Sequence, residues 1–328
     1  MHDLGRRLPR VTAGARRAPG HRQHRDPALS TATTRSAVLV YNPGSGARRD
    51  RFHSVTRMAE ALRRQGLVVT PRTTSGRDDA TRITAEAVTR GAEMVIAHGG
   101  DGTVNEVVQA LVGTDVPLAL WPGGTANVLA RELGLPADPD RLARIIAAGV
   151  TRRVSVGRAG QRYFLLMAAV GLDAETLGSV HPGLKRLTGE GAYWLAGLKQ
   201  LTAWNPIPFV VEANGERYRA TFAVVANAPS YAGGLRFAPD ASMEDDLLDL
   251  CLFDATERAR FARYLAAALT GSHVGLPGVT CVKTRHAVAQ GPDNRLVHVD
   301  GERLGRLPVA FDCVPAALSL VVPPETAP

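Results

Sequence analysis

The stretch MVIAHGGDGTVNEVV, residues 94–108, changes its pattern twice within a short distance. Residues 94–98 predict a buried strand, residues 99–102 form a glycine-rich loop, and from Val104 onward valines recur at the spacing of one helix face. A strand that passes through glycines into an amphipathic helix is the repeating unit of folds in which helices cover a parallel sheet. The stretch therefore predicts an α/β arrangement around it.

The same alternation extends over residues 36–149. Further strands are predicted at 37–41, 67–70 and 116–121, and further helices at 52–62 and 79–90. Because sequential strands joined by helices run parallel, we expect a mainly parallel sheet with ligands bound at the carboxyl ends of its strands.

After residue 151 the pattern changes to strands and hairpins. Strands are predicted at 209–213, 217–225, 248–253, 279–289, 296–299 and 318–322, with helical segments near 184–204 and 256–269. Asn214-Gly215, between the first two strands, is a strong two-residue hairpin signal. We therefore expect a mostly antiparallel β second domain.

Three predicted junctions between a strand and a helix are rich in glycine: residues 42–46, 99–103 and 123–127. Each would place backbone amides at a helix N-terminus, where they favour anionic phosphate. One such loop is as well explained by a tight turn, but three on one sheet edge indicate a polyphosphate ligand. Asp101 within the middle loop would repel that ligand unless a divalent metal intervened, which points to Mg-nucleotide.

Several other nucleotide-binding classes are disfavoured. No G-x-x-x-x-G-K-[ST] loop occurs, and the catalytic motifs of protein kinases are absent from the sequence. Gly100-x-Gly102 lacks the third glycine of a dinucleotide fingerprint, because Asn105 stands in that position. A Rossmann dehydrogenase is therefore an unfavourable interpretation.

The order and spacing of the motifs VYNPGSG (40–46), HGGDGTVNEVV (98–108) and PGGTANVLARELG (122–134) resemble the diacylglycerol kinase catalytic-domain family. This family includes bacterial lipid kinases and is related to sphingosine and ceramide kinases. Counterparts continue with VGLDAE, ANAPSYAGGLRFAPDASMEDDLLDL and VHVDGE, so the resemblance covers roughly residues 37–323. GGDGT alone also occurs in NAD kinases and phosphofructokinases, but its combination with NPGSG and a late DGE is far more specific.

The resemblance implies an α/β nucleotide-binding domain with a mainly parallel sheet, plus a mostly antiparallel, β-sandwich-like second domain that contributes to the lipid site. The predicted domains are 36–150, with a strand at about 315–325 returning to it, and 151–314. ATP would lie between them. The residues expected around ATP are Asn42, Pro43, Gly44, Ser45, Gly46, Thr74, Gly100, Asp101, Gly102, Thr103, Val104, Asn105, Glu106 and Thr125.

Family members also bind a divalent cation near a D-G-L step, which implies an Mg²⁺ site at Asp245 with the carbonyls of Ser242 and Leu247. Two residues depart from the family pattern. Asp246 stands where glycine is usual, and Val128 stands where many bacterial members have an aspartate that joins the metal's water network. The alternative interpretation of residues 244–246, which we favour less than the metal site, is a solvated acidic turn.

Transfer to a lipid hydroxyl needs a carboxylate to accept its proton. In bacterial members this role belongs to the DGE glutamate, which matches Glu302, whereas sphingosine kinase relatives favour the GGDGT aspartate, which matches Asp101. We expect Glu302 to be the base. A surface glutamate after an ordinary Asp-Gly turn would be the default interpretation without the other motifs.

The charge and composition limit the partners. Of the net charge of +8, residues 1–35 carry +6, from eight Arg and two Asp, so the rest is nearly neutral and predicts no nucleic-acid surface. Residues 1–35 lack an apolar core and predict a disordered basic tail; an organelle transit peptide is the alternative. No apolar run reaches the roughly 20 residues of a membrane span. Three cysteines without metal or redox spacing suit free thiols in the cytoplasm.

The predicted activity is ATP- and Mg²⁺-dependent transfer of the γ-phosphoryl group to a lipid hydroxyl, with diacylglycerol as the leading acceptor. We expect a cytoplasmic enzyme that contacts its lipid substrate peripherally at the membrane surface; a homodimer is compatible with the sequence. Tyr193, Trp194, Leu198, Leu201 and Trp204 could form a membrane-touching face, although core packing is the more common role of such a stripe. The alternatives are an NAD kinase-like enzyme and an inactive nucleotide- and lipid-binding protein.

Overall fold

The computed structural model describes residues 35–45, 51–171, 206–231, 234–292 and 295–324. The helices in these ranges are α1 (Arg51–Arg64), α2 (Asp79–Thr89), α3 (Asp101–Leu111), α4 (Val128–Glu132), α5 (Pro139–Ala148) and α9 (Arg258–Ala268). The strands in the first half of the chain are β1 (Arg35–Tyr41), β2 (Leu67–Thr73), β3 (Val95–Gly99), β4 (Leu118–Pro122), β5 (Thr151–Ala159), β6 (Arg162–Phe164) and β7 (Met167–Val170). The remaining strands are β8 (Phe209–Ala213), β9 (Glu216–Ala220), β10 (Phe222–Ala226), β11 (Leu248–Phe253), β12 (Val279–Thr284), β13 (His286–Gln290), β14 (Leu296–Val299), β15 (Glu302–Arg306) and β16 (Val309–Val321).

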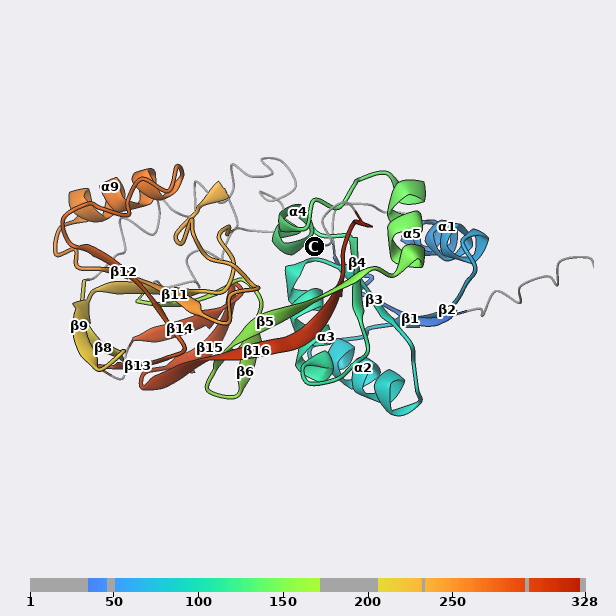
Figure 1. The fold of residues 1–328 in the computed structure, drawn as a ribbon, viewed down its shortest axis with the longest axis horizontal. Helices are drawn as coiled ribbons and strands as arrows, with labels where there is room; N and C mark the ends of the chain where they lie inside the picture. Colours follow the sequence, from blue (N-terminus) through green and yellow to red (C-terminus); the bar gives the residue numbers. More distant parts are fainter. Residues whose placement is uncertain (1–34, 46–50, 172–205, 232–233, 293–294, 325–328) are drawn as a thin grey trace, which may run out of the picture. The chain divides into compact units, whose positions relative to one another are not determined.

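Strands β2, β1, β3 and β4 lie side by side in this order and run parallel. Side chains alternate between the two faces of the sheet, so that Leu39 packs in the core with α1 and α5 whereas Val40 packs with α2 and α3. Figure 1 shows the two pairs of helices on opposite sides of these strands. Both faces are therefore covered, which is why the strands are almost continuously apolar.

Strand β16 extends the parallel sheet into the second half of the molecule. Near its end it runs parallel to β4, with Leu320 opposite Leu118, and earlier it runs antiparallel to β13 and β5. Its pairing with β5 is irregular between Val314 and Leu318, where Ala316 has a φ of 44°. One 10-stranded sheet consequently runs through both halves.

A second sheet of six strands, in the order β12-β11-β10-β7-β14-β15, is antiparallel throughout. One of its faces packs on the β8, β9 and β13 part of the larger sheet, so the two sheets form a sandwich. The other face packs with α9 through a phenylalanine cluster, in which the rings of Phe222 and Phe253 stack with centroids 5.1 Å apart. A pair of this kind contributes about 1 kcal/mol beyond its burial.

The predicted fold class is confirmed, but the strand predicted at 318–322 begins already at Val309, as β16, and two other predicted strands are each divided. Residues 217–225 form two strands, β9 and β10, that belong to different sheets. The chain changes sheet at Thr221, whose buried hydroxyl is bonded to the carbonyls of Phe253 and Ala255. Residues 279–289 likewise divide at Arg285 into β12 and β13.

The turn between β8 and β9 agrees with its prediction, whereas α5 and the start of β1 do not. Asn214 and Gly215 form the turn between β8 and β9 with φ values of 54° and 81°, as their hairpin signal predicts. Helix α5 was not predicted, although Pro139 begins it and the Asp138 carboxylate accepts a hydrogen bond from the Arg141 amide. Strand β1 begins at Arg35, one residue earlier than the predicted domain. Residues 1–34 and the helical segment predicted near 184–204 lie outside the described ranges.

Candidate active site

The three glycine-rich loops follow neighbouring parallel strands and meet at one edge of the sheet. Residue 42 follows β1, Gly100 follows β3 and Gly123 follows β4. Backbone hydrogen bonds join the loops, from the Gly123 amide to the Gly99 carbonyl at 2.8 Å and from the Asn42 amide to the His98 carbonyl at 3.1 Å. This is the edge of an open α/β sheet at which ligands bind.

Two of the glycines are needed for contact between loops. A methyl group on Gly124 would lie 2.4 Å from the Cα atom of Gly100, so the two backbones approach each other with no room for a side chain. The Asn127 side chain closes the later loop, with Oδ1 accepting from the Gly124 amide and Nδ2 donating to the Gly124 carbonyl. The fixed loops therefore present their backbones rather than side chains along this edge.

The loop after β1 is organised by Asn42. Its Oδ1 accepts a hydrogen bond from the Gly44 amide at 2.7 Å, and its Nδ2 lies 3.4 Å from the hydroxyl of Thr103 in α3. The Ser45 hydroxyl donates to the Asn42 carbonyl. Pro43 and Gly44 are exposed, whereas Gly46 lies outside the described residues.

The carboxylate of Asp101 is bonded to the start of α4. Its Oδ1 accepts from the Val128 amide at 2.8 Å. Burial raises the pKa of Asp101, and hydrogen bonds from backbone amides, chiefly that of Val128, partly offset the rise. Asp101 thus links the loop after β3 to the first residue of α4.

Asn105 and Asp300 form a buried link between α3 and the second half of the chain. Asn105 Nδ2 donates to Asp300 Oδ2 at 2.9 Å, and the Asp300 carboxylate also accepts from the amides of Leu165, Leu166 and Met167 at 2.9–3.0 Å. Burial raises the pKa of Asp300, while these donors oppose the rise. Asn105, expected beside ATP, has its amide engaged in this link.

Glu302 lies two residues beyond Asp300 and reaches the glycine loop. A methyl group on Gly102 would be 3.3 Å from Glu302 Oε1. Glu302 Oε2 lies 3.5 Å from an Arg162 guanidinium nitrogen and 3.8 Å from one of Arg77. The structure therefore brings the predicted base to the predicted phosphate loop and adds two arginines that the motifs did not indicate.

The other residues expected around ATP have different surroundings. The Glu106 carboxylate accepts from the Ala80 amide at the start of α2, at 3.1 Å. Thr74 is buried, Thr125 is exposed and Val104 is partly buried against the core. Glu106 consequently contacts α2, and its predicted contact with ATP stays a prediction.

Of the predicted metal residues, Asp245 contacts an ammonium group, that of Lys283. Lys283 Nζ lies 2.7 Å from Asp245 Oδ2, 2.9 Å from Asp249 Oδ2 and 3.1 Å from the Asp240 carbonyl. Burial lowers the pKa of Lys283, but the hydrogen bonds to Asp245 and Asp249 outweigh it and the pKa is raised. The other Asp245 oxygen accepts from the Leu247 amide. As placed, these oxygens fit a monovalent ammonium better than a divalent cation.

The two departures from the family pattern have visible consequences. Asp246 adopts a φ of 56°, a conformation that glycine takes most easily, and its Oδ1 accepts a hydrogen bond from the Ser155 hydroxyl at 2.6 Å. Val128 is buried and contributes its amide to Asp101. The Ser242 hydroxyl accepts from the Glu244 amide. Each of these residues therefore takes part in a hydrogen bond within the chain.

Comparison with known proteins agrees with this arrangement. Residues 36–159 match the diacylglycerol kinase catalytic domain, and residues 167–322 match the YegS C-terminal NAD kinase beta sandwich-like domain. A diacylglycerol kinase of Bacillus subtilis is 30% identical over 296 residues, which are 89% of this chain and 97% of the relative. The chain belongs to the diacylglycerol kinase family.

Other members of the family support the same placement. A diacylglycerol kinase of Mycobacterium tuberculosis is 35% identical over 75% of this chain and 82% of its own length. The crystal structure of a diacylglycerol kinase from Bacillus anthracis superposes with a TM-score of 0.73, at 25% identity over 89% of this chain and 98% of that one. As a diacylglycerol kinase family member, the protein is a lipid kinase. Among its described residues, no helix is long and apolar enough to cross a membrane.

Proposed function

We propose that this lipid kinase transfers the γ-phosphoryl group of ATP, bound with Mg²⁺, to the hydroxyl of diacylglycerol. The observation that supports this most directly is the position of Glu302, whose carboxylate lies against the Gly102 backbone of the phosphate loop. A carboxylate and backbone amides at one point can serve an acceptor hydroxyl and a phosphoryl group together. The names of the relatives from Bacillus subtilis and Mycobacterium tuberculosis support diacylglycerol as the acceptor.

ATP would be held along the joined loops, by the residues around Asn42, Gly100 and Gly124. The close approach of the last two leaves backbone, with no side chains, along the edge where phosphates would lie. Magnesium bound to the phosphates would neutralise charge during transfer. Asp101 supplies the carboxylate among the described residues of these loops. A negative charge there would attract the metal ion and would repel phosphate that carries no metal.

We assign the proton acceptor to Glu302 rather than to Asp101. Asp101 Oδ1 is occupied by the amide of Val128, whereas Glu302 projects to the loop surface and is partly exposed. Guanidinium nitrogens of Arg162 and Arg77 lie 3.5 Å and 3.8 Å from Glu302 Oε2. The same arginines are placed to attract the charged phosphoryl group.

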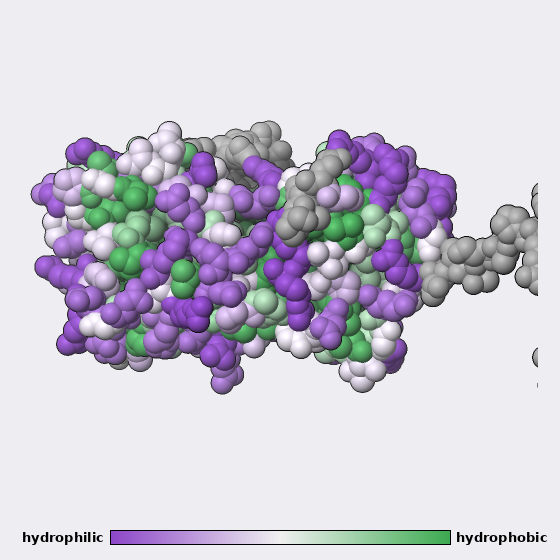
Figure 2. Space-filling view, in the orientation of Figure 1, coloured by the Kyte–Doolittle hydropathy of each residue, from purple (hydrophilic) through white to green (hydrophobic). Residues whose placement is uncertain are grey.

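A divalent cation at Ser242, Asp245 and Leu247 would require Lys283 to leave the Asp245 carboxylate. We therefore derive no part of the transfer from that site. The protein would meet its acceptor as a cytoplasmic enzyme in peripheral contact with the membrane. The described large apolar side chains that are exposed are Val68, Val274 and Leu304, and the face in Figure 2 is largely hydrophilic with separate apolar areas. The predicted membrane-touching residues, from Tyr193 to Trp204, lie outside the described ranges.

The decisive experiment is incubation of the full chain with labelled ATP and Mg²⁺ in three separate arms: diacylglycerol vesicles, a mixed lipid extract, and NAD. We expect labelled phosphatidic acid in the first two arms and no labelled NADP in the third. Transfer to a different lipid alone would replace diacylglycerol as the acceptor. Transfer to NAD but to no lipid would overturn the proposal, and ATP binding without any transfer would identify an inactive binding protein.

A further inference from the structure

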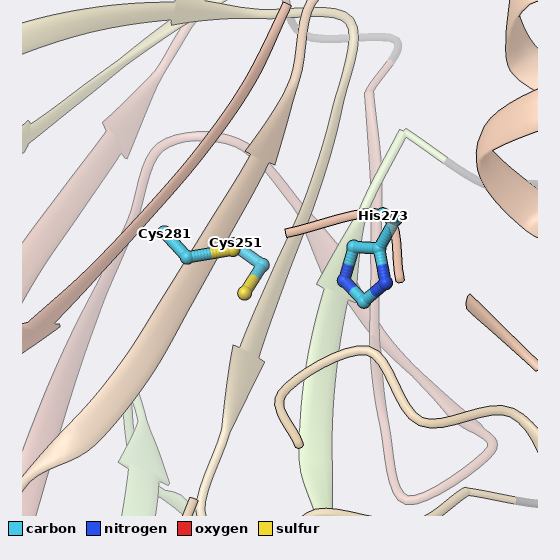
Figure 3. A group of neighbouring side chains, drawn as sticks. All are labelled: Cys251, His273 and Cys281. Atoms are coloured by element: carbon cyan, nitrogen blue, oxygen red, sulfur yellow. The ribbon is translucent and has the colours of Figure 1, made fainter. Parts of the chain in front are cut away.

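Two cysteines and a histidine meet inside the second half of the molecule, among residues outside the phosphate loops. Cys251 of β11 and Cys281 of β12 are direct partners in the antiparallel register. His273 follows α9 in a separate turn. The two sulfurs and a nitrogen of His273 all lie within 4.8 Å of one another, and Figure 3 shows the imidazole ring facing the two cysteine side chains.

The histidine ring is held in place from several sides. His273 is fully buried, and its ring stacks on Phe253 with centroids 5.6 Å apart. Nε2 lies 2.8 Å from the carbonyl oxygen of Phe237, so it carries a proton and donates there. Nδ1 is also buried and has no hydrogen-bond partner among the described residues.

An imidazole nitrogen buried without a partner is costly and calls for a physical reason. Histidines that ligate metals bind the ion through one nitrogen and donate the other N–H to an oxygen, often a backbone carbonyl. The Phe237 carbonyl already supplies such an oxygen. A metal ion bound through Nδ1 would therefore give both nitrogens of His273 a partner, with Nε2 still donating to the Phe237 carbonyl.

The cysteines complete a donor set of two sulfurs and one nitrogen. Two thiolates and an imidazole select thiophilic cations such as Zn²⁺ and Cu⁺ over Mg²⁺, which prefers oxygen. A tetrahedral zinc site has neighbouring ligand atoms about 3.5–3.8 Å apart. The observed limit of 4.8 Å requires only about 1 Å of closure, which side-chain rotation can supply.

The electrostatics of the pair agree with this geometry. A hydrogen bond from the Cys251 thiol lowers the pKa of Cys281 and raises that of Cys251, with His273 adding to the effect at Cys281. Cys281 is partly exposed while Cys251 is buried, so the more acidic thiol is also the one nearer to solvent. Binding of a cation by both sulfurs would release the protons of both thiols.

We propose that Cys251, Cys281 and His273 form a binding site for a thiophilic cation, Zn²⁺ or Cu⁺. The ion would tie β11 and β12 to the turn after α9 and, through the Phe237 carbonyl, to the segment that leads toward Asp240. Its role is structural, and the site takes no part in phosphoryl transfer. Because a bound ion stabilises the folded state alone, the metal should raise the melting temperature.

The test uses the full chain without a histidine tag, reduced and stripped of metal, then loaded with Zn²⁺ in one arm and Cu⁺ in another. After desalting against a weak chelator, elemental analysis gives the metal bound per chain. We expect one equivalent of the preferred ion in the wild type, a loss of that equivalent in Cys281→Ser and His273→Asn, and full retention in Cys313→Ser. Cys313 is the matched control, because it is a free cysteine of β16 that does not belong to the cluster.

Loading with Co²⁺ gives a second readout, since a thiolate ligand produces a charge-transfer absorption that Cys281→Ser should abolish. Cys281 is only partly buried, so its serine variant should fold even where His273→Asn does not. Equal metal retention by the wild type and Cys281→Ser would overturn the proposal. So would a reduced wild-type protein that retains neither ion, or one whose cysteine pair only forms a disulfide.

Discussion

Glu302 contacts the phosphate loop without belonging to it, and this separates its role from that of Asp101. For Glu302→Gln we expect turnover to fall on the order of 10²-fold or more with little change in the KM for ATP, because the amide keeps the shape and loses the basicity. Asp101→Asn should lower turnover and also raise the KM for ATP. Steady-state kinetics over a range of ATP concentrations distinguishes the two variants.

Glu60→Gln, an exposed position in α1, is the matched control and should behave as the wild type. Asp101→Asn should remain folded, since the new side chain can still accept a hydrogen bond from the Val128 amide. Because burial raises the pKa of Asp101, the folded protein disfavours its ionised form, and removing the charge should not lower stability. A Glu302→Gln enzyme with normal turnover and a raised KM would instead make Glu302 a binding residue.

Lys283 allows the predicted cation site at Asp245 to be tested directly. Lys283→Met leaves the carboxylates of Asp245 and Asp249 without their counter-charge, so we expect Mg²⁺ alone to raise the melting temperature of this variant and not that of the wild type. Thermal unfolding with and without Mg²⁺, in the absence of nucleotide, measures this. An Mg²⁺-dependent rise in the wild type that Asp245→Asn removes would show that the metal displaces the lysine.

The sequence predicted the loops of the site, but it did not predict the contacts made by side chains that are distant in the sequence. The glycine loops and Glu302 are local motifs, and the structure brings Gly102 and Glu302 together. Arg162 and Lys283 follow no motif, because the carboxylates that each contacts are more than thirty residues away in the sequence. Asn105 was expected beside ATP on its position in a motif, and only the structure shows the bond to Asp300.

At the scale of elements, the contact between two glycine loops fixes the edge of the parallel sheet. Gly124→Ala would place a methyl group 2.4 Å from Gly100, so we expect a loss of about 1–3 kcal/mol of stability and weaker ATP binding. Urea denaturation and nucleotide titration measure the two effects. Gly76→Ala is the control, because a methyl group there meets nothing within 4 Å. Unchanged ATP affinity in Gly124→Ala would show that the loops can separate without harm to the site.

Helix α2 begins with an acidic residue that binds the preceding turn. The pKa of Asp79 is lowered from 3.8 to about 2, first by the Ser75 amide, then by the Ser75 hydroxyl and by Arg82. Since the folded pKa is depressed, its stabilisation is present above about pH 4 and is lost as pH falls toward 2. Asp79→Asn should therefore lower the melting temperature at neutral pH and lose this effect in acid. The exposed Asp115→Asn is the comparison, and a pH-independent difference for Asp79→Asn would contradict the expectation.

Predicting strands proved easier than assigning them to sheets. Alternation of apolar residues identified residues 217–225 and 279–289 as extended, but it carries no information about the sheet that each residue joins. The changes of sheet occur at Thr221 and Arg285, and Thr221 is marked only by hydrogen bonds to carbonyls more than thirty residues away. Helix α5 had a start signal in the Asp138 cap and Pro139, although no helix was predicted there.

At the scale of the whole molecule, the basic segment before β1 can be removed as a test. Deletion of residues 1–34 should leave activity and melting temperature unchanged, because the sequence predicts no core in that segment. The deletion stops before Arg35, whose guanidinium donates to the Ala147 carbonyl. Deletion of residues 1–41 is the control and should prevent folding, since it removes β1 from between β2 and β3. A lower melting temperature after the shorter deletion would assign the segment a structural role.

Strand β16 bears on how such enzymes can be recombined. It lies in the part of the chain that matches the C-terminal family domain, yet its last residues pair with β4 in the part that matches the catalytic domain. Consider a chimaera that is joined between residues 159 and 167 and takes its two parts from different enzymes. The parallel sheet of its first part would then contain β16 of the second enzyme. The irregular step near Ala316 offers a second crossover, where the native end of β16 can be restored. Exchange of the second half of the chain between relatives consequently calls for two junctions rather than one.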